Sequence, residues 1–301
     1  MPFGLSRKDA AALALAISLV LSAAAAFAVT GSDAVKRGEY LFRAADCTSC
    51  HTDSAHKGAF LAGGPALKTP FGVFYAPNIT PDPRFGIGAW SETDFRRALR
   101  QGIGRRGQYL YPVFPYPSFT HMTDRDIADL YAYLRTVKPV AKPSRQSKIK
   151  PPFNWRFLLT FWRLLYFDEG PLPATPTRSA EWRRGRYLAE AVAHCQECHT
   201  PRNFMGGRDE SMAYSGNPHG PDGQDAPNIT PDPSSGIGGW SVADITQLLT
   251  DGQTPDFDFV GSGMAEVVKG TGALIPADRH AIAVYIKSLR PIHTVRPKKK
   301  K

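Results

Sequence analysis

The chain of 301 residues contains little cysteine, little methionine and few long apolar runs. Its four cysteines limit it to two disulfide bonds, and its five methionines make any methionine site easy to locate. After residue 29, no segment is long and apolar enough to cross a membrane. No nucleic-acid-binding motif occurs either. The net charge of +10 therefore favours acidic proteins or phospholipid headgroups over nucleic acid as partners.

The one long apolar run lies at the N-terminus. Arg7 and Lys8 precede an Ala-rich run over residues 10–29, which contains a small-x-small pattern ending at Ala28. This order is typical of an export signal, so we expect residues 1–28 to be a signal peptide. The alternative is an uncleaved membrane anchor, for which the run is weakly apolar. In both cases we expect the remaining chain in the periplasm, either soluble or associated with the membrane.

Three motifs occur twice in the same order. Gly38–Leu41 recurs as Gly185–Leu188, Cys47–Thr52 as Cys195–Thr200, and Ala76–Pro83 as Ala226–Pro233. Such a repeat indicates internal duplication, with one domain in each half. The predicted parts are a first domain over 32–138, a linker over 139–177, a second domain over 178–291 and a basic tail over 292–301.

Each half shows amphipathic helical stretches separated by long loops rich in Pro and Gly. In the first half we expect helices over 35–42, over 92–101 after Ser91, and over 124–137 after Thr123. No clear strand alternation is present, so the fold class is predicted to be all-α. Loops of this length would normally count against the assignment, but they make sense if they wrap a large apolar cofactor that supplies part of the core.

Each half also carries one Cys-x-x-Cys-His pentad. The first runs from Cys47 through Cys50 to His51, and the second from Cys195 through Cys198 to His199. Two cysteines at this spacing can form thioethers to one haem, and the adjacent His can bind its iron. The alternatives are zinc, a thioredoxin-like redox pair and two disulfides. The wide separation of the pentads and the absence of a βαβ pattern count against the first two. We therefore predict two covalent haem c groups.

A haem that transfers electrons usually has a sixth ligand, often Met. For the second haem we predict Met264, in a Gly-rich loop before the last helix. The corresponding position of the first half is Phe114, which cannot bind iron. Met122 is our first choice there, with His121 or no sixth ligand as alternatives.

The linker contains a strongly aromatic run over residues 153–167. It is too short to cross a bilayer but long enough for a helix. It is interpreted either as a helix packed between the domains or as a docking surface for a partner or a membrane.

These motifs, together with Pro70-Phe71-Gly72 and Pro115–Phe119, resemble the cytochrome c subunits of membrane-associated alcohol, aldehyde and gluconate dehydrogenases. The resemblance covers most of the mature chain. It implies tandem class I cytochrome c-like domains and a periplasmic acceptor that passes electrons from a dehydrogenase to quinone or a terminal oxidase. That family usually has three haem domains, and it carries Met at the position of Phe114.

The function predicted from these features is electron transfer without independent catalysis. A di-haem peroxidase with an open first haem is one alternative. A docking or membrane-tethering subunit that uses the aromatic linker is another.

Overall fold

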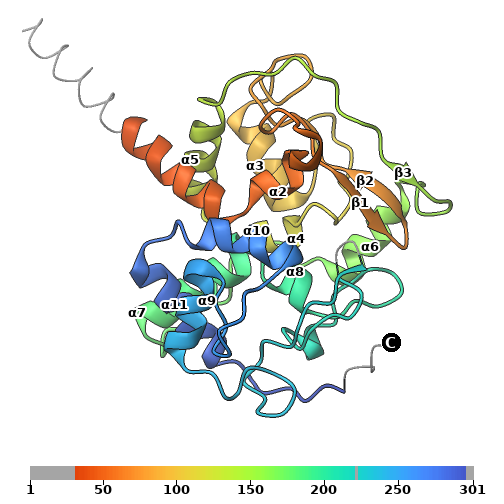
Figure 1. The fold of residues 1–301 in the computed structure, drawn as a ribbon. Helices are drawn as coiled ribbons and strands as arrows, with labels where there is room; N and C mark the ends of the chain where they lie inside the picture. Colours follow the sequence, from red (N-terminus) through yellow and green to blue (C-terminus); the bar gives the residue numbers. More distant parts are fainter. Residues whose placement is uncertain (1–30, 221–222, 296–301) are drawn as a thin grey trace, which may run out of the picture.

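The computed structural model describes residues 31–220 and 223–295. The expected signal peptide and residues 296–301 of the expected tail lie outside the described residues. The chain forms helices joined by long loops, with the first repeat above the second in the view of Figure 1. No described helix is long and apolar enough to cross a membrane.

The two repeats present their elements in the same order. The first repeat contains a helix over residues 31–44, then α2 (Cys47–His51), η1 (Ser54–His56), α3 (Glu92–Gln101), α4 (Tyr116–Phe119) and α5 (Asp124–Leu134). The second contains α7 (Ala180–Tyr187), η2 (Leu188–Val192), α8 (Gln196–His199), η3 (Glu210–Met212), α9 (Val242–Asp251), α10 (Ser262–Thr271) and α11 (Pro276–Lys287). The predicted helices of the first repeat are therefore present, although the last ends at Leu134 rather than residue 137.

Short side chains cap the helices as expected. Ser91 and Asp94 form a complete capping box at the start of α3, and Ser241 and Asp244 form the same box at α9. Thr123 accepts a hydrogen bond from a backbone N–H of the first turn of α5. These contacts satisfy the N–H groups that a helix start leaves without partners, which explains why the starts after Ser91 and Thr123 could be predicted.

The all-α prediction is wrong in one respect, because the chain also forms a small antiparallel sheet. β1 (Ala66–Thr69) and β2 (Gly72–Tyr75) make a hairpin, and β3 (Lys148–Ile149) from the linker pairs with β2. Strands of four and two residues are too short to show an alternating pattern. The sheet ties the linker to the first repeat.

Within each repeat the helix before the pentad crosses the last helix at a glycine. A Cβ on Gly38 would lie 1.9 Å from the Asp129 carbonyl oxygen in α5. A Cβ on Gly185 would lie 1.9 Å from the Ala281 carbonyl oxygen in α11. The repeated glycine therefore allows two helices to approach more closely than any side chain permits.

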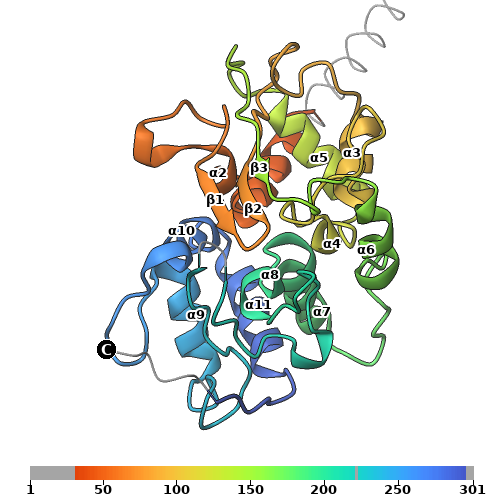
Figure 2. The same ribbon diagram turned by 90° about the vertical axis from the view of Figure 1, so that its right-hand side faces the viewer.

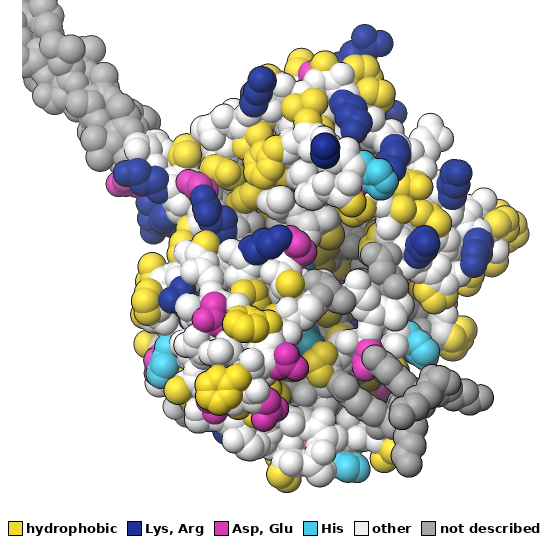
Figure 3. Space-filling model, in the orientation of Figure 1, with side chains coloured by type: hydrophobic (Ala, Val, Ile, Leu, Met, Phe, Trp, Pro, Cys, Tyr) yellow, Lys and Arg dark blue, Asp and Glu magenta, His cyan; other side chains and the backbone are white. Residues whose placement is uncertain are grey.

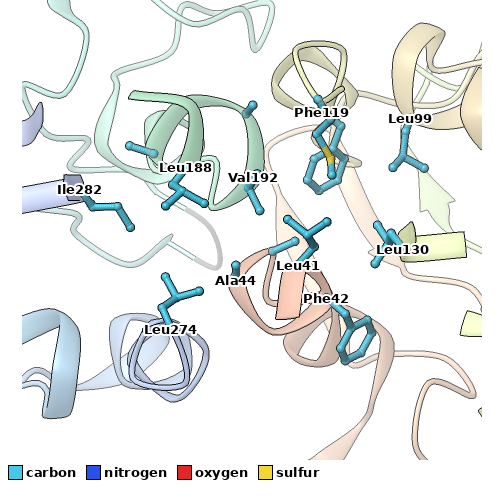
Figure 4. Packing of buried hydrophobic residues seen from close by; sticks show 14 of the residues in the cluster. Leu41, Phe42, Ala44, Leu99, Phe119, Leu130, Leu188, Val192, Leu274 and Ile282 are labelled. Carbon is cyan, nitrogen blue, oxygen red and sulfur yellow. The ribbon is translucent and has the colours of Figure 1, made fainter. Parts of the chain in front are cut away.

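Apolar side chains of both repeats form one buried cluster. Leu41 and Ala44 of the first repeat point toward Leu188 and Val192 of the second in Figure 4. All four side chains are at most 3% exposed. Because the cluster crosses the boundary between the repeats, their packing is shared.

The helix before the second pentad contains a π-helical turn, η2. The second repeat has one more residue than the first between the repeated leucine (Leu41, Leu188) and the first cysteine (Cys47, Cys195). A π-helical turn absorbs one extra residue without breaking the helix. The insertion therefore leaves the helix crossing and the pentad where they are in the first repeat.

Two tyrosine–aspartate contacts join the repeats reciprocally. The Tyr40 hydroxyl donates to Asp278 Oδ2 in α11 at 2.6 Å. The corresponding Tyr187 hydroxyl donates to Asp126 in α5. Tyr40 and Tyr187 occupy the same position of the repeated Gly-x-Tyr-Leu motif. Each repeat thus offers the other the same tyrosine and the same aspartate, as in a twofold-symmetric interface.

A backbone contact completes each of these pairs. The Ile275 N–H donates to the Tyr40 hydroxyl oxygen at 3.3 Å, and the Thr123 N–H donates to the Tyr187 hydroxyl oxygen at 3.1 Å. Both N–H groups belong to N-cap residues, of α11 and α5. Each tyrosine therefore reaches the start of the last helix of the other repeat.

The aromatic run of the linker forms α6 (Leu158–Tyr166) on the outer flank of the molecule in Figure 2. Its inner face packs through Leu159 and Trp162, and Trp162 Nε1 donates to the Met205 carbonyl oxygen at 3.1 Å. Its outer face and the segment before it leave large apolar side chains 54–79% exposed: Trp155, Phe157, Phe161, Leu164 and Leu165. The inner face fits the interpretation as a packed helix, whereas the interpretation as a docking surface stays a prediction.

Candidate haem sites

Each pentad lies on a short helix that follows a left-handed residue. Asp46, before Cys47, has φ 47°, and His194, before Cys195, has φ 42°. Residues other than Gly seldom adopt this conformation, and Asp and His do so more readily than most. The sharp turn separates each pentad from the long helix before it. The cysteines and the histidine are therefore presented on a single turn.

The histidine of each pentad is oriented by a backbone carbonyl. His51 Nδ1 lies 2.7 Å from the Pro77 oxygen, and His199 Nδ1 lies 2.7 Å from the Pro227 oxygen. A carbonyl only accepts, so each Nδ1 must donate and its proton cannot be on Nε2. This tautomer leaves the Nε2 lone pair to bind a metal, which is the usual arrangement for a ligating histidine. Burial lowers the pKa of His51 and so favours the neutral ring that a ligand needs.

The block that supplies these carbonyls is held by its own asparagine. The Asn78 side chain donates to the Val140 carbonyl and accepts from the Thr80 N–H at 2.9 Å. Asn228 does the same with the Ile292 carbonyl and the Thr230 N–H at 2.8 Å. Both asparagines are 2% exposed. Sequence reasoning assigned no role to this block, although its duplication marked it as important.

The threonine after each pentad holds a neighbouring loop in position, a role that the sequence alone did not reveal. Thr52 Oγ1 accepts from the Leu61 N–H at 3.0 Å, and Thr200 Oγ1 accepts from the Tyr214 N–H at 3.1 Å. Both threonines are buried. They fix the loop that passes over each pentad, and the only signal was again the repetition.

The environment of three of the four cysteines favours neutral thiols. None of the four cysteines, all within the described residues, is in a disulfide bond. Burial raises the pKa of Cys47 well above its usual value, that of Cys195 to about 12, and that of Cys198 to about 11. Thiol exchange requires the thiolate, which burial disfavours. Thioether formation with haem leaves an uncharged sulfur, which suits this environment.

The second pentad contains a largely buried carboxylate. Glu197, between its cysteines, has a side chain 11% exposed and pairs with Arg202 and Arg208. Burial raises the pKa of Glu197, but the two guanidinium groups outweigh this effect and lower it overall. Glu197 Oε1 also accepts from Ser118 Oγ in α4 at 2.9 Å. The second pentad is thus attached to the first repeat.

The structure places Met264 differently from its predicted position. The prediction of a loop there is wrong, because Met264 lies in the first turn of α10 and packs against the shared apolar cluster. Gly261 precedes α10 in an extended conformation, so the helix begins directly after the Gly-rich segment that suggested a loop. The assignment of Met264 as a sixth ligand stays a prediction.

The candidates for the first haem lie close together before α5. Met122 is fully buried in the apolar cluster, and its carbonyl accepts from Arg100 Nη2 at 2.7 Å. His121 Nδ1 donates to the Gly170 oxygen at 2.6 Å, and burial lowers the pKa of its ring. Phe114 packs against Phe119 with ring centroids 5.6 Å apart. The choice of sixth ligand stays a prediction here as well.

One buried polar atom of the second pentad suits a bound group. Gln196 Oε1 is buried and makes no hydrogen bond within the described protein. Buried polar atoms in proteins normally have partners, so this oxygen is suited to an additional group. With the paired cysteines and the oriented histidine, the residues present fit haem c. Haem supplies the one-electron chemistry of its iron when it is bound.

Comparison with known proteins identifies similar chains. The cytochrome c family profile matches residues 35–138. A protein named diheme cytochrome c-type from Cereibacter sphaeroides is 43% identical over 265 residues, covering 85% of this chain and 86% of that protein. The cytochrome subunit of fructose dehydrogenase from Gluconobacter japonicus is 43% identical, covering 85% of this chain and 52% of the subunit. The gluconate 2-dehydrogenase cytochrome c subunit of Pantoea cypripedii is 39% identical, covering 92% and 64%.

Proposed function

The chain belongs to the cytochrome c family that includes these di-haem and dehydrogenase-linked proteins, and on this basis we propose that it carries electrons through two covalent haems, one in each repeat. Cys47 and Cys50 would hold the first haem, and Cys195 and Cys198 the second. His51 and His199 would be the proximal ligands. In this proposal the repeats are tandem class I cytochrome c domains that share an interface.

The observation that supports two haems most strongly is the repeated orientation of the histidine. Both pentads have the same 2.7 Å contact from Nδ1 to the carbonyl of a corresponding proline. A degenerate second copy would have no need to preserve this contact or the Asn and Thr side chains around it. Met264 and Met122 complete the proposal as distal ligands of the second and first haem.

The proposed setting is the periplasm, between a dehydrogenase and the respiratory chain. Several similar proteins are named as cytochrome subunits of dehydrogenases. This chain spans only 52–64% of the length of these three, so the donor need not be the same. The face in Figure 3 shows Lys and Arg gathered over the first repeat and Asp and Glu over the second. Opposite charges on one face would steer a donor and an acceptor to different ends.

We place the docking surface for a dehydrogenase partner on the outer face of α6. A helix with apolar side chains on all sides is normally buried, yet in α6 only Leu159 and Trp162 are fully buried. The outward face carries no charge, because the guanidinium of Arg163 lies over the Tyr109 and Phe167 rings. Aromatic side chains on such a patch are typical of interface cores.

Counting the haems tests the central proposal. The purified protein should contain two haems, and its redox titration should show two one-electron steps with low-spin spectra. Replacing Cys47 and Cys50 together by Ala should remove one haem, and replacing Cys195 and Cys198 together should remove the other. A single haem in the unaltered protein would contradict the proposal.

A di-haem peroxidase is the competing function, and Phe114 is the observation that keeps it open. That enzyme needs one haem with an open or displaceable distal site. Low-spin spectra at both sites, with no binding of cyanide and no turnover of peroxide, would exclude it. Peroxide turnover that is lost when Cys47 and Cys50 are replaced would favour the peroxidase over a simple electron carrier.

The docking surface has its own test. Replacing Phe161 and Leu164 by Ser should weaken association with the purified donor while both haem spectra stay intact. Replacing Phe257 by Ser is the control, because this side chain is 81% exposed and lies outside the linker. If the Phe161 and Leu164 variant and the Phe257 control associated equally well with the donor, the donor would bind elsewhere on the protein.

A further inference from the structure

One side chain crosses from the second pentad to the first. His194, directly before Cys195, has its Nε2 3.3 Å from the carbonyl oxygen of Ala45. The carbonyl only accepts, so the ring must donate from Nε2. Ala45 is separated from Cys47 by one residue. The contact therefore connects the main chain beside one pair of haem attachment sites to the main chain beside the other.

The equivalent residue of the first repeat does not make this contact. Asp46 occupies the same position and has the same left-handed backbone conformation. Its carboxylate accepts from Ser49 Oγ at 2.6 Å, within its own pentad. The connection therefore runs in one direction, from the second repeat to the first, although the surrounding interface is reciprocal.

The ring of His194 is held in place from the side by an aromatic ring. Phe119 of α4 packs edge-on against it, with centroids 5.4 Å apart and planes 78° apart. The same helix α4 contributes Ser118, which binds Glu197 inside the second pentad. Two neighbouring side chains of the first repeat thus hold the second pentad in place on either side of Cys195.

The extra residue of the second repeat lies just before His194. In η2 the Ala193 N–H donates to the Leu188 carbonyl at 2.7 Å, and the Cys195 N–H donates to the Ala189 carbonyl at 2.9 Å. These wide backbone turns carry the chain to His194 one residue later than in the first repeat. The insertion thus coincides with the position at which the two repeats differ in their contacts.

We propose that His194 is a positioning residue that couples the two haem sites electronically, through its hydrogen bond to the Ala45 carbonyl. This rests on the proposed di-haem function. The path runs from the Cys47 backbone through Ala45, across the hydrogen bond to His194, and on to Cys195. It carries one electron, so that one site is oxidised as the other is reduced, and no bond or proton is exchanged. His194 also fixes the spacing of the two attachment segments.

The test measures exchange within the protein. In the half-reduced protein, NMR exchange spectroscopy gives the rate at which an electron moves between the two sites. His194→Gly suits the left-handed backbone and removes the ring, and it should slow this exchange several-fold with both haem spectra unchanged. His194→Gln retains a donor and should restore part of the rate. Hydrogen exchange at the Cys47 and Cys195 amides reports separately on the packing of the two segments.

Controls distinguish coupling from a structural role. His280→Ala removes an exposed histidine that pairs with Glu181 at the surface, and it should leave the exchange rate unaltered. An unchanged rate in folded His194→Gly overturns the proposal, whatever happens to hydrogen exchange. If His194→Gly does not fold, Phe119→Leu is the second variant. It keeps the His194 donor but removes the aromatic ring that supports it, so it should also slow electron exchange. An unaltered exchange rate in Phe119→Leu would overturn the proposal. A wrong haem count in the unaltered protein would instead reveal failure of the proposed function.

Discussion

The two repeats agree at some of the residues predicted to surround the haems and differ at others. Both repeats orient the pentad histidine through a proline carbonyl. The positions that we predict to face the haems from the opposite side differ, with Phe114 in one repeat and Met264 in the other. The orientation of the pentad histidine is thus duplicated, whereas the predicted distal positions have diverged. Differences in potential between the sites are expected to arise there.

The ligand assignment at Met264 leads to a spectroscopic prediction. Met264→Ala should convert one ferric haem from low spin to high spin and lower its potential, because Met ligation raises the potential of a c-type haem. Absorption spectra and a redox titration would measure both effects. Met212→Ala in η3 (Glu210–Met212) is the matched control and should change neither. An unaltered spectrum for Met264→Ala would assign the ligand to another residue.

Among the helices and strands, features that depend on neighbouring residues could be predicted from the sequence. Features that depend on contacts between distant segments could not. The capping box at Ser91 depends on residues three apart, so the start of α3 was predicted, and the same local signal is present at Ser241 before α9. The sheet was not, because β3 is two residues long and depends on a partner far away in sequence. η2 depends on how one inserted residue is accommodated by packing. The pentads were predictable because covalent haem attachment needs fixed residue types, whereas the carbonyls and His194 act through contacts between distant segments.

The helix crossings give a prediction about stability. Gly38→Ala or Gly185→Ala would place a methyl group 1.9 Å from a backbone carbonyl oxygen, which the neighbouring helix can avoid only by moving. Each should lower the free energy of unfolding by about 1–3 kcal/mol or more, as overpacking does. Denaturant unfolding monitored by circular dichroism would measure the loss. Gly239→Ala meets nothing within 4 Å and should be nearly neutral; a comparable loss there would refute the explanation.

For the molecule as a whole, the Tyr40–Asp278 pair makes the interface sensitive to acid. Burial raises the pKa of Asp278, but hydrogen bonds from Arg184 and Tyr40 outweigh it and hold the pKa below its usual range. A carboxyl with a depressed folded pKa contributes stability above its unfolded pKa of about 3.9 and loses it as the pH falls through the folded value. The interface should therefore weaken below about pH 4.

Removing this carboxylate should reproduce the effect at neutral pH. Asp278→Asn should cost about 2 kcal/mol at pH 7, because it weakens hydrogen bonds to a charged group. Its melting temperature should then depend less on pH than that of the unaltered protein between pH 5 and about pH 2. Asp256→Asn, at an exposed position, is the control. Parallel pH profiles for the unaltered protein and Asp278→Asn would show that this pair does not set the acid sensitivity.

The reciprocal interface has a consequence for the origin of the molecule. A contact in which each side presents the same tyrosine and the same aspartate is what two identical subunits form about a twofold axis. The arrangement is therefore what we expect if two copies of a shorter chain first associated as a homodimer. Fusion through the linker made association independent of concentration, as any covalent tether does. Once two copies are fused, each copy can mutate alone. The inserted residue and His194 occur in one repeat only, whereas a mutation in a homodimer changes both subunits at once.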